Sequence, residues 1–122
     1  MVVLQVAQRA TDLNRAEQFY TLLLGRTASA RFDPPGLLFF DLGGVRLLLD
    51  ANAPSALLYL KVLDLDAEVA RLRAAGVEVV TEPHQIFVHH DDTLGPTGAQ
   101  EWQAFVRDSE GNTVGLIEWR MP

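Results

Sequence analysis

Apolar and polar positions along this chain follow two periods, one of about two residues and one of about 3.6. The longer period occurs twice, once after Thr11 or Asp12 as the capping residue and once after Asp64, and it stops at Gly25 and Gly76. The shorter period predicts strands at Val2–Arg9, Thr27–Phe32, Leu37–Leu42, Val45–Leu49, Ala56–Leu63, Val77–Thr81, Ile86–His90, Gln100–Arg107 and Thr113–Arg120. The first half therefore reads as strand, helix and three strands, and the same order begins again after residue 55.

Turn signals separate these elements. Pro34-Pro35-Gly36 and Gly43-Gly44 mark tight turns, and Glu82-Pro83 is expected to break a strand because proline cannot donate to a ladder. The last turn, Asp108–Asn112, combines residues that tolerate positive φ with an aspartate that can bond to nearby backbone. It predicts a closing hairpin.

The order of elements is an internal repeat that can be aligned. Matching the two helix caps places Gln5 opposite Leu57, and matching Gly44 with Asn112 places Asp50 opposite Glu118. Neither half is large enough to close a core alone. We therefore predict an α+β domain over residues 1–122, in which two βαβββ modules form a pseudo-twofold pair. Module 1 covers about 1–50, the linker 51–55, and module 2 about 56–122.

Composition narrows the class of function. The 122 residues carry a formal charge of −6, which argues against nucleic acid and against an anionic membrane as partners. The absence of cysteine excludes thiolate chemistry and disulfides. No apolar stretch is long enough to span a bilayer and the N-terminus does not resemble a signal peptide, so a cytoplasmic protein is expected. Phosphate-binding glycine loops and a nucleophile elbow are also lacking.

One carboxylate stands out. Glu118 lies between Ile117 and Trp119 on the last predicted strand, where burial would be costly without a cation or hydrogen-bond donors. Either its strand face is exposed or it lines a cleft that uses its charge. Its repeat counterpart Asp50 ends the matching strand of the first module, which favours a shared cleft.

Other side chains can be assigned to the same cleft by strand alternation. Leu57, Tyr59 and Lys61, the only lysine, share one side of their strand. Trp102 shares a side with Ala104 and Val106, where it either floors the cleft or fills the core. His84 is placed to act as a ligand or proton shuttle, with a backbone-bonded histidine as the plainer alternative. The run from His89 to Asp92 is interpreted as a solvated turn.

The repeat and its motifs resemble the vicinal oxygen chelate superfamily, the group of glyoxalases, bleomycin-resistance proteins and extradiol dioxygenases. The similarity covers nearly the whole chain and rests on three segments: Gln5 to Gly25, Asp64-Leu65 to Gly76, and Phe105 to Glu118. It implies paired modules whose sheets curl around a cleft. It also implies a small-molecule substrate and a homodimer.

In glyoxalase-like members a divalent metal such as Ni, Mn, Zn or Fe is held on the first and last strands of each module. The resemblance places these ligands at Gln5, Asp50, Leu57 and Glu118, and Leu57 cannot ligate a metal. Two functions follow. One is a lyase or isomerase in which the metal polarises a carbonyl or enediolate while a carboxylate, Glu118 or Asp50, or the imidazole of His84 moves a proton. The alternative is a metal-free protein that sequesters a ligand, as bleomycin-resistance members do. A degenerate structural module is a third reading.

Overall fold

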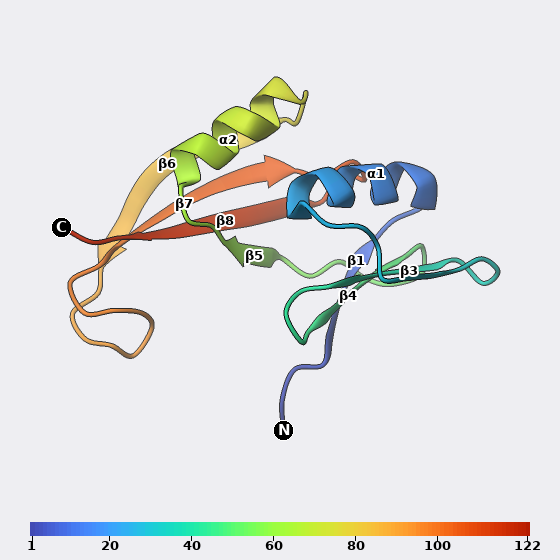
Figure 1. Ribbon diagram of the computed structural model, residues 1–122, viewed down its shortest axis with the longest axis horizontal. Helices are drawn as coiled ribbons and strands as arrows, with labels where there is room; N and C mark the ends of the chain where they lie inside the picture. Colours follow the sequence, from blue (N-terminus) through green and yellow to red (C-terminus); the bar gives the residue numbers. More distant parts are fainter. The chain divides into compact units, whose positions relative to one another are not determined.

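The computed structural model describes every residue from Met1 to Pro122. The chain divides into two compact units, one formed by Met1–Ala56 with Asp108–Asn112 and the other by Leu57–Arg107 with Thr113–Pro122. Each unit holds one helix and one four-stranded mixed sheet (Figure 1). The predicted α+β class with a repeated βαβββ order is confirmed. Neither helix has the length and apolar character that a membrane span requires.

The first unit orders its strands as β1-β4-β3-β2, with β1 parallel to β4 and the other neighbours antiparallel. Its elements are β1 (Gln5–Arg9), α1 (Leu13–Leu24), β2 (Ala30–Phe32), β3 (Leu37–Asp41) and β4 (Arg46–Asp50). Helix α1 packs on β3 and β4. The core between them consists of Ala16, Tyr20, Leu23, Leu38, Phe40, Leu47 and Leu49. Alternation along β3 buries Phe40 and leaves Phe39 half-buried on the other face.

Helix α1 begins and ends where its capping residues predict. The Asp12 carboxylate accepts a hydrogen bond from the Arg15 amide at 3.1 Å, which satisfies a donor at the helix start. Gly25 ends the helix in the left-handed conformation, with φ of 67°. Asp64 caps the second helix in the same way through the Ala67 amide at 3.1 Å.

The second unit orders its strands as β5-β8-β7-β6, with β5 parallel to β8. Its elements are β5 (Leu58–Lys61), α2 (Leu65–Ala74), β6 (Val79–Val88), β7 (Gln100–Arg107) and β8 (Thr113–Arg120). Helix α2 lies across β6, β7 and β8 (Figure 1). It buries Leu65, Val69 and Leu72. The sheet residues buried with them include Leu58, Ala104, Val106, Val114 and Leu116.

Strand β6 corrects one prediction. Glu82-Pro83 was expected to separate two strands, but β6 runs without a break from Val79 to Val88. The register between β6 and β7 shifts between Thr81 and His84, so Pro83 lies at a bulge. Strand β6 is also an edge strand, with a neighbouring strand on one side only. A proline, which has no amide hydrogen, can be accommodated at such a position without the loss of a hydrogen bond between strands.

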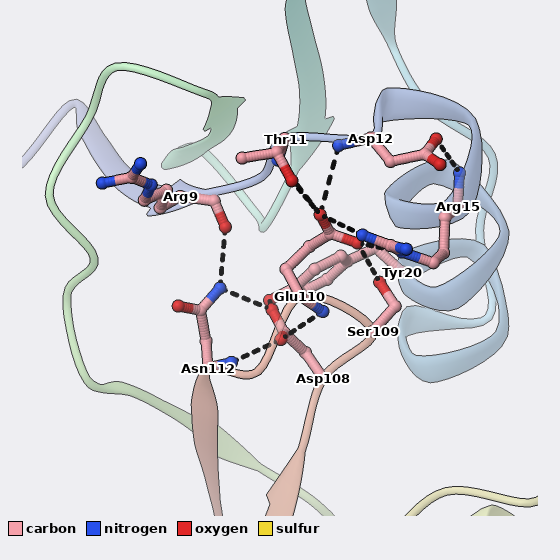
Figure 2. Close-up of polar contacts among 9 residues, drawn as sticks. All are labelled: Arg9, Thr11, Asp12, Arg15, Tyr20, Asp108, Ser109, Glu110 and Asn112. Atoms are coloured by element: carbon pink, nitrogen blue, oxygen red, sulfur yellow. Dashed lines mark hydrogen bonds and ion pairs between the residues drawn. The ribbon is translucent and has the colours of Figure 1, made fainter.

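The tip of the last hairpin, Asp108–Asn112, belongs to the first unit and is held there by two buried carboxylates (Figure 2). Asp108 accepts hydrogen bonds from the Tyr20 hydroxyl at 2.8 Å and from the backbone amides of Glu110 and Asn112. Burial, with the Asp108 carboxylate as a further cause, raises the pKa of the Tyr20 hydroxyl far above its ordinary value. Tyr20 therefore stays protonated and serves as a donor.

Glu110 anchors the same turn to the start of α1 (Figure 2). Its side chain is 2% exposed and forms an ion pair with Arg15, whose Nε lies 2.7 Å from Oε2. The backbone amides of Thr11 and Asp12 donate to Oε1 at 3.0 and 3.2 Å. The hydrogen bond from Arg15 is the main cause that lowers the pKa of Glu110 to about 2. The turn is therefore fixed by a carboxylate that remains ionised.

Candidate functional site

Two predicted metal ligands, Gln5 and Asp50, lie on neighbouring strands of the first unit but at opposite ends. In the parallel pairing of β1 with β4, Gln5 is opposite Arg46 and Asp50 is opposite Arg9. Four residues of strand separate them, which corresponds to roughly 13 Å. Oxygen ligands of one divalent ion lie within about 2.6 Å of it. Gln5 and Asp50 of one chain therefore do not reach a common ion, and Asp50 instead accepts a bond from the Asn52 amide at 2.9 Å.

The third predicted ligand, Glu118, is in the second unit and faces α2. It is 7% exposed, and its Oε1 accepts a hydrogen bond from the backbone amide of Leu65 at 2.9 Å. Leu65 is the first residue of α2, where amides lack partners within the helix and the helix dipole favours a negative charge. Its other oxygen forms an ion pair with Arg120. The carboxylate expected in a cleft is thus used to cap a helix.

Trp102 lies on the same side of the sheet as Glu118, because the two are cross-strand partners. The guanidinium of Arg120 covers its ring at 4.0 Å from the centroid, and its Nε1 donates to the Gln100 side chain. Arg120 also pairs with Asp66 of α2. Trp102 was expected either to floor the cleft or to fill the core. Its position on the face that packs on α2 agrees with the second of these expectations.

The opposite side of this sheet, the helix-free face, displays three rows of side chains. The strand registers place cross-strand partners side by side, and such partners share a face. The first row is Tyr59, Gly115, Phe105 and Thr81; the second is Lys61, Ile117, Gln103 and His84; the third is Trp119, Glu101 and Phe87. A row with a cation at one end and an imidazole at the other therefore runs between two rows rich in aromatic rings.

Gly115 allows the first row to pack. A Cβ at Gly115 would lie 2.6 Å from the Tyr59 ring and 3.1 Å from the Phe105 ring, so a side chain is excluded by its neighbours. The rings of Tyr59 and Phe105 meet edge to face over this position, with centroids 5.8 Å apart. Tyr59 remains 46% exposed, which leaves an aromatic surface available for contact.

Lys61 and His84 stand at the two ends of the middle row. The Lys61 ammonium lies 4.2 Å from the centroid of the Trp119 ring, a distance typical of a cation–π contact. His84 is exposed, and its Nδ1 lies 2.9 Å from the carbonyl oxygen of Glu82. This contact is the one expected of a histidine that is hydrogen-bonded to the backbone. Leu57, just before β5, is 52% exposed and lies at the edge of the sheet.

His89 and Glu101 form a buried pair that the sequence reading missed. His89 was expected in a solvated turn, but its side chain is 1% exposed and its Nε2 lies 3.0 Å from Oε1 of Glu101. Trp119 donates to the same oxygen at 3.3 Å and Gln103 donates to the other at 2.9 Å. One signal was present: Glu101 and Gln103 alternate with apolar residues along β7, which marks a second, polar face.

The comparisons with known proteins agree with this architecture. The family model described as the Glyoxalase/Bleomycin resistance protein/Dioxygenase superfamily matches residues 2–116. The chain belongs to this superfamily. No curated protein sequence is significantly similar to the chain.

Several solved structures share the superfamily fold. Lactoylglutathione lyase from Agrobacterium tumefaciens is 25% identical, with a TM-score of 0.66 and coverage of 96% of this chain and 92% of that one. Virulence protein STM3117 from Salmonella typhimurium is 18% identical, with a TM-score of 0.71 and coverage of 98% and 97%. A glyoxalase/bleomycin resistance protein/dioxygenase from Alicyclobacillus acidocaldarius is 19% identical, with a TM-score of 0.69 and coverage of 97% and 91%.

Divalent metals are common in the superfamily, so the donor set of this chain is a direct test of fit. In neither unit do three histidine, aspartate or glutamate side chains gather as a metal-binding group. Glu118 is occupied by the start of α2 and by Arg120, and Leu57 has no donor atom. The residues at the expected ligand positions therefore do not fit a metal within one chain.

Proposed function

We propose that this protein binds a small organic molecule without a metal, on the helix-free face of the β5-β8-β7-β6 sheet. The observation that carries the proposal is the three-row arrangement, in which aromatic rings flank a polar middle row. Binding sites for small molecules are usually concave and mostly apolar with a few placed polar groups, and the side chains of this face supply that mixture of groups. The metal-free alternative among the two predicted functions is the one this geometry favours.

The polar groups on this face differ in availability. Glu101 is buried and accepts bonds from His89, Gln103 and Trp119, so it orients neighbours and holds the Trp119 ring in place. Lys61 and His84 are exposed and can reach a ligand. Tyr59 supplies an exposed ring beside them. This division into fixed and available groups supports recognition of a ligand.

The test uses protein treated with EDTA and three naphthalene probes of equal size: 2-naphthamide, 2-naphthoate and 2-naphthylmethylammonium. Binding of at least one probe at submillimolar Kd is expected, with amide NMR shifts concentrated at residues of the three rows. Trp102→Phe leaves Trp119 as the sole indole and should retain a fluorescence response, whereas Trp119→Phe should lose it. If no probe binds, or binding needs an added metal, the proposal fails.

A second candidate is the metal-dependent lyase or isomerase predicted from the sequence, with Gln5, Asp50 and Glu118 as ligands and Glu118 or His84 as proton carrier. The specific observation in its favour is the 25% identity to a lactoylglutathione lyase over most of both chains. It requires Glu118 to leave the Leu65 amide. Titration of untagged protein with Ni, Mn, Zn and Fe(II) decides it: micromolar binding that Glu118→Ala abolishes would favour this candidate.

We also propose a homodimer, as is common in this superfamily. Light scattering combined with size-exclusion chromatography should give twice the 13.5 kDa mass of the chain. A monomer at micromolar concentration would contradict it, and would leave metal-free binding on the helix-free face unaffected because that face is formed by one chain.

A further inference from the structure

Lys61 is the one lysine or arginine of the second unit that has no ion-pair partner. Each of the four arginines there has a carboxylate within ion-pairing distance: Arg71 pairs with Glu68, Arg73 with Glu82, Arg107 with Glu78, and Arg120 with Glu118 and Asp66. Lys61 has no such partner, although the chain carries an excess of six negative charges. Its ammonium lies instead over the Trp119 ring.

The surroundings of Lys61 favour an anion over a cation. Among the side chains of the three rows, Glu101 is the one carboxylate, and it is 9% exposed with three donors directed at its oxygens. It therefore offers no free acceptor to a ligand cation. The ammonium of Lys61, in contrast, retains donors that the indole ring does not satisfy, because a cation–π contact uses no lone pair.

The geometry around Lys61 also indicates the size of the ligand. Tyr59 lies two residues before Lys61 on the same face of β5, roughly 7 Å along the strand. Tyr59 is 46% exposed, and Ile117 lies beside Lys61 on β8. A flat apolar group placed over Tyr59 and Ile117 would bring an attached acid group within reach of the lysine side chain. Neighbouring apolar surface would lower the local dielectric and strengthen the ion pair.

Resting on the binding function proposed above, we propose that the ligand is an aryl carboxylate whose carboxylate pairs with Lys61 and whose ring lies on Tyr59 and Ile117. A single charge is favoured because one lysine, and no arginine fork, is available to neutralise it. A phosphate dianion would leave one charge uncompensated. Recognition here is binding only, and no bond of the ligand is formed or broken.

The experiment compares 2-naphthoate with 2-naphthamide, which has the same shape and no charge, on EDTA-treated protein. Wild type is expected to bind the carboxylate roughly tenfold more tightly than the amide, as one charge-assisted contact of about 1.4 kcal/mol would give. Lys61→Met keeps the apolar stem and should remove that preference, whereas Lys61→Arg should retain most of it. Raising the salt concentration should weaken carboxylate binding and leave amide binding unchanged.

Distinct outcomes separate this inference from the binding function on which it rests. Equal affinity for the two probes, or a preference that survives in Lys61→Met, overturns the aryl carboxylate while leaving the binding face in place. Preference for 2-naphthylmethylammonium overturns it in the same way. Failure of all three probes to bind removes both proposals. Circular dichroism and the midpoint of urea unfolding confirm that Lys61→Met is folded, which is expected because Lys61 is exposed.

Discussion

The imidazole of His89 lies 3.0 Å from the carboxylate of Glu101, and both side chains are buried on the helix-free face of the second unit. The pair joins β7 to the residue that follows β6, and the Trp119 indole on β8 donates to the same carboxylate oxygen. Strands β7 and β8 and the residue that follows β6 are thus connected through one acidic group. A carboxylate in this position organises the face on which a ligand is proposed to bind.

Removing that carboxylate should be strongly destabilising. Glu101→Ala leaves the donors of His89, Gln103 and Trp119 without their acceptor, and we expect a loss of about 3 kcal/mol in the free energy of unfolding. Glu101→Gln keeps the shape and one acceptor oxygen and should cost about half as much. Urea denaturation followed by circular dichroism measures both. Equal stability of the alanine variant and wild type would show that the network contributes nothing.

Gly95 lies against the same network and should not tolerate a side chain. A Cβ there would lie 2.6 Å from Cε1 of His89 and 3.0 Å from Cε2 of Trp119. Gly95→Ala is therefore expected to lower the free energy of unfolding by about 1–3 kcal/mol, as overpacking does, and to shift Trp119 fluorescence. Thr97→Ala, in the exposed part of the same loop, is the matched control and should change neither property. An unaltered Gly95→Ala would contradict the contact.

The fold was readable from the sequence because its signals are local. The helix ends are set by hydrogen bonds to residues a few positions away, as at Asp12, Asp64 and Gly25. The neighbouring sequence is therefore sufficient to predict where each helix begins or ends. Pro83 shows where this fails. Whether proline ends a strand depends on whether that strand is at an edge of the sheet, which is a property of the strand order and not of the neighbouring residues.

The site was harder to predict because alternation says which residues share a face but not which face. Leu116 and Glu118 do share one, yet it is the face that packs on α2. A second limit applies to Gln5 and Asp50: alternation does not say which residues lie opposite one another in a parallel pair, because that register is set by tertiary packing. His89 was mistaken for a solvated residue because the loop after it folds back to cover the ring, which no periodicity reports.

Gln8 should be replaceable by an apolar residue of similar size. It is fully buried in the first unit near the Tyr20 hydroxyl, and neither its amide nitrogen nor its amide oxygen forms a hydrogen bond of good geometry. An unpaired buried amide costs about 1–3 kcal/mol, so Gln8→Leu is expected to raise the midpoint of thermal unfolding. Gln18→Leu on α1 is the comparison, because that side chain is exposed and gains nothing by the change. A Gln8→Leu protein less stable than wild type would contradict the expectation.

Glu118 should behave as a helix cap rather than as a metal ligand. Glu118→Ala removes the acceptor of the Leu65 amide and the ion-pair partner of Arg120, and we expect the free energy of unfolding to fall by about 2 kcal/mol. Glu118→Gln keeps an acceptor and should lose about half of that. Calorimetric titration with Ni²⁺ should be the same for wild type and Glu118→Ala. A metal affinity that depends on Glu118 would contradict the capping role.

Glu110 should make the first unit sensitive to acid. Its pKa is lowered from 4.5 to about 2 in the folded protein, so folding is favoured by the ionised form. The contribution is present in full above the unfolded value and is lost as the pH falls from 4.5 towards about 2. Glu110→Gln should therefore cost on the order of 2 kcal/mol at pH 7, because it removes the charge that Arg15 and the Thr11 and Asp12 amides bind.

The decisive measurement is the difference in free energy of unfolding between wild type and Glu110→Gln, taken by urea denaturation from pH 7 to about pH 3. The difference should be constant down to about pH 5 and should become smaller at lower pH. Wild type is destabilised there because Glu110 becomes protonated, whereas the glutamine of the variant does not ionise. Glu78→Gln, whose side chain is 68% exposed, is the matched control and should show little difference at any pH. A gap that does not change with pH would show that the charge of Glu110 contributes nothing and that only its shape holds the turn against α1.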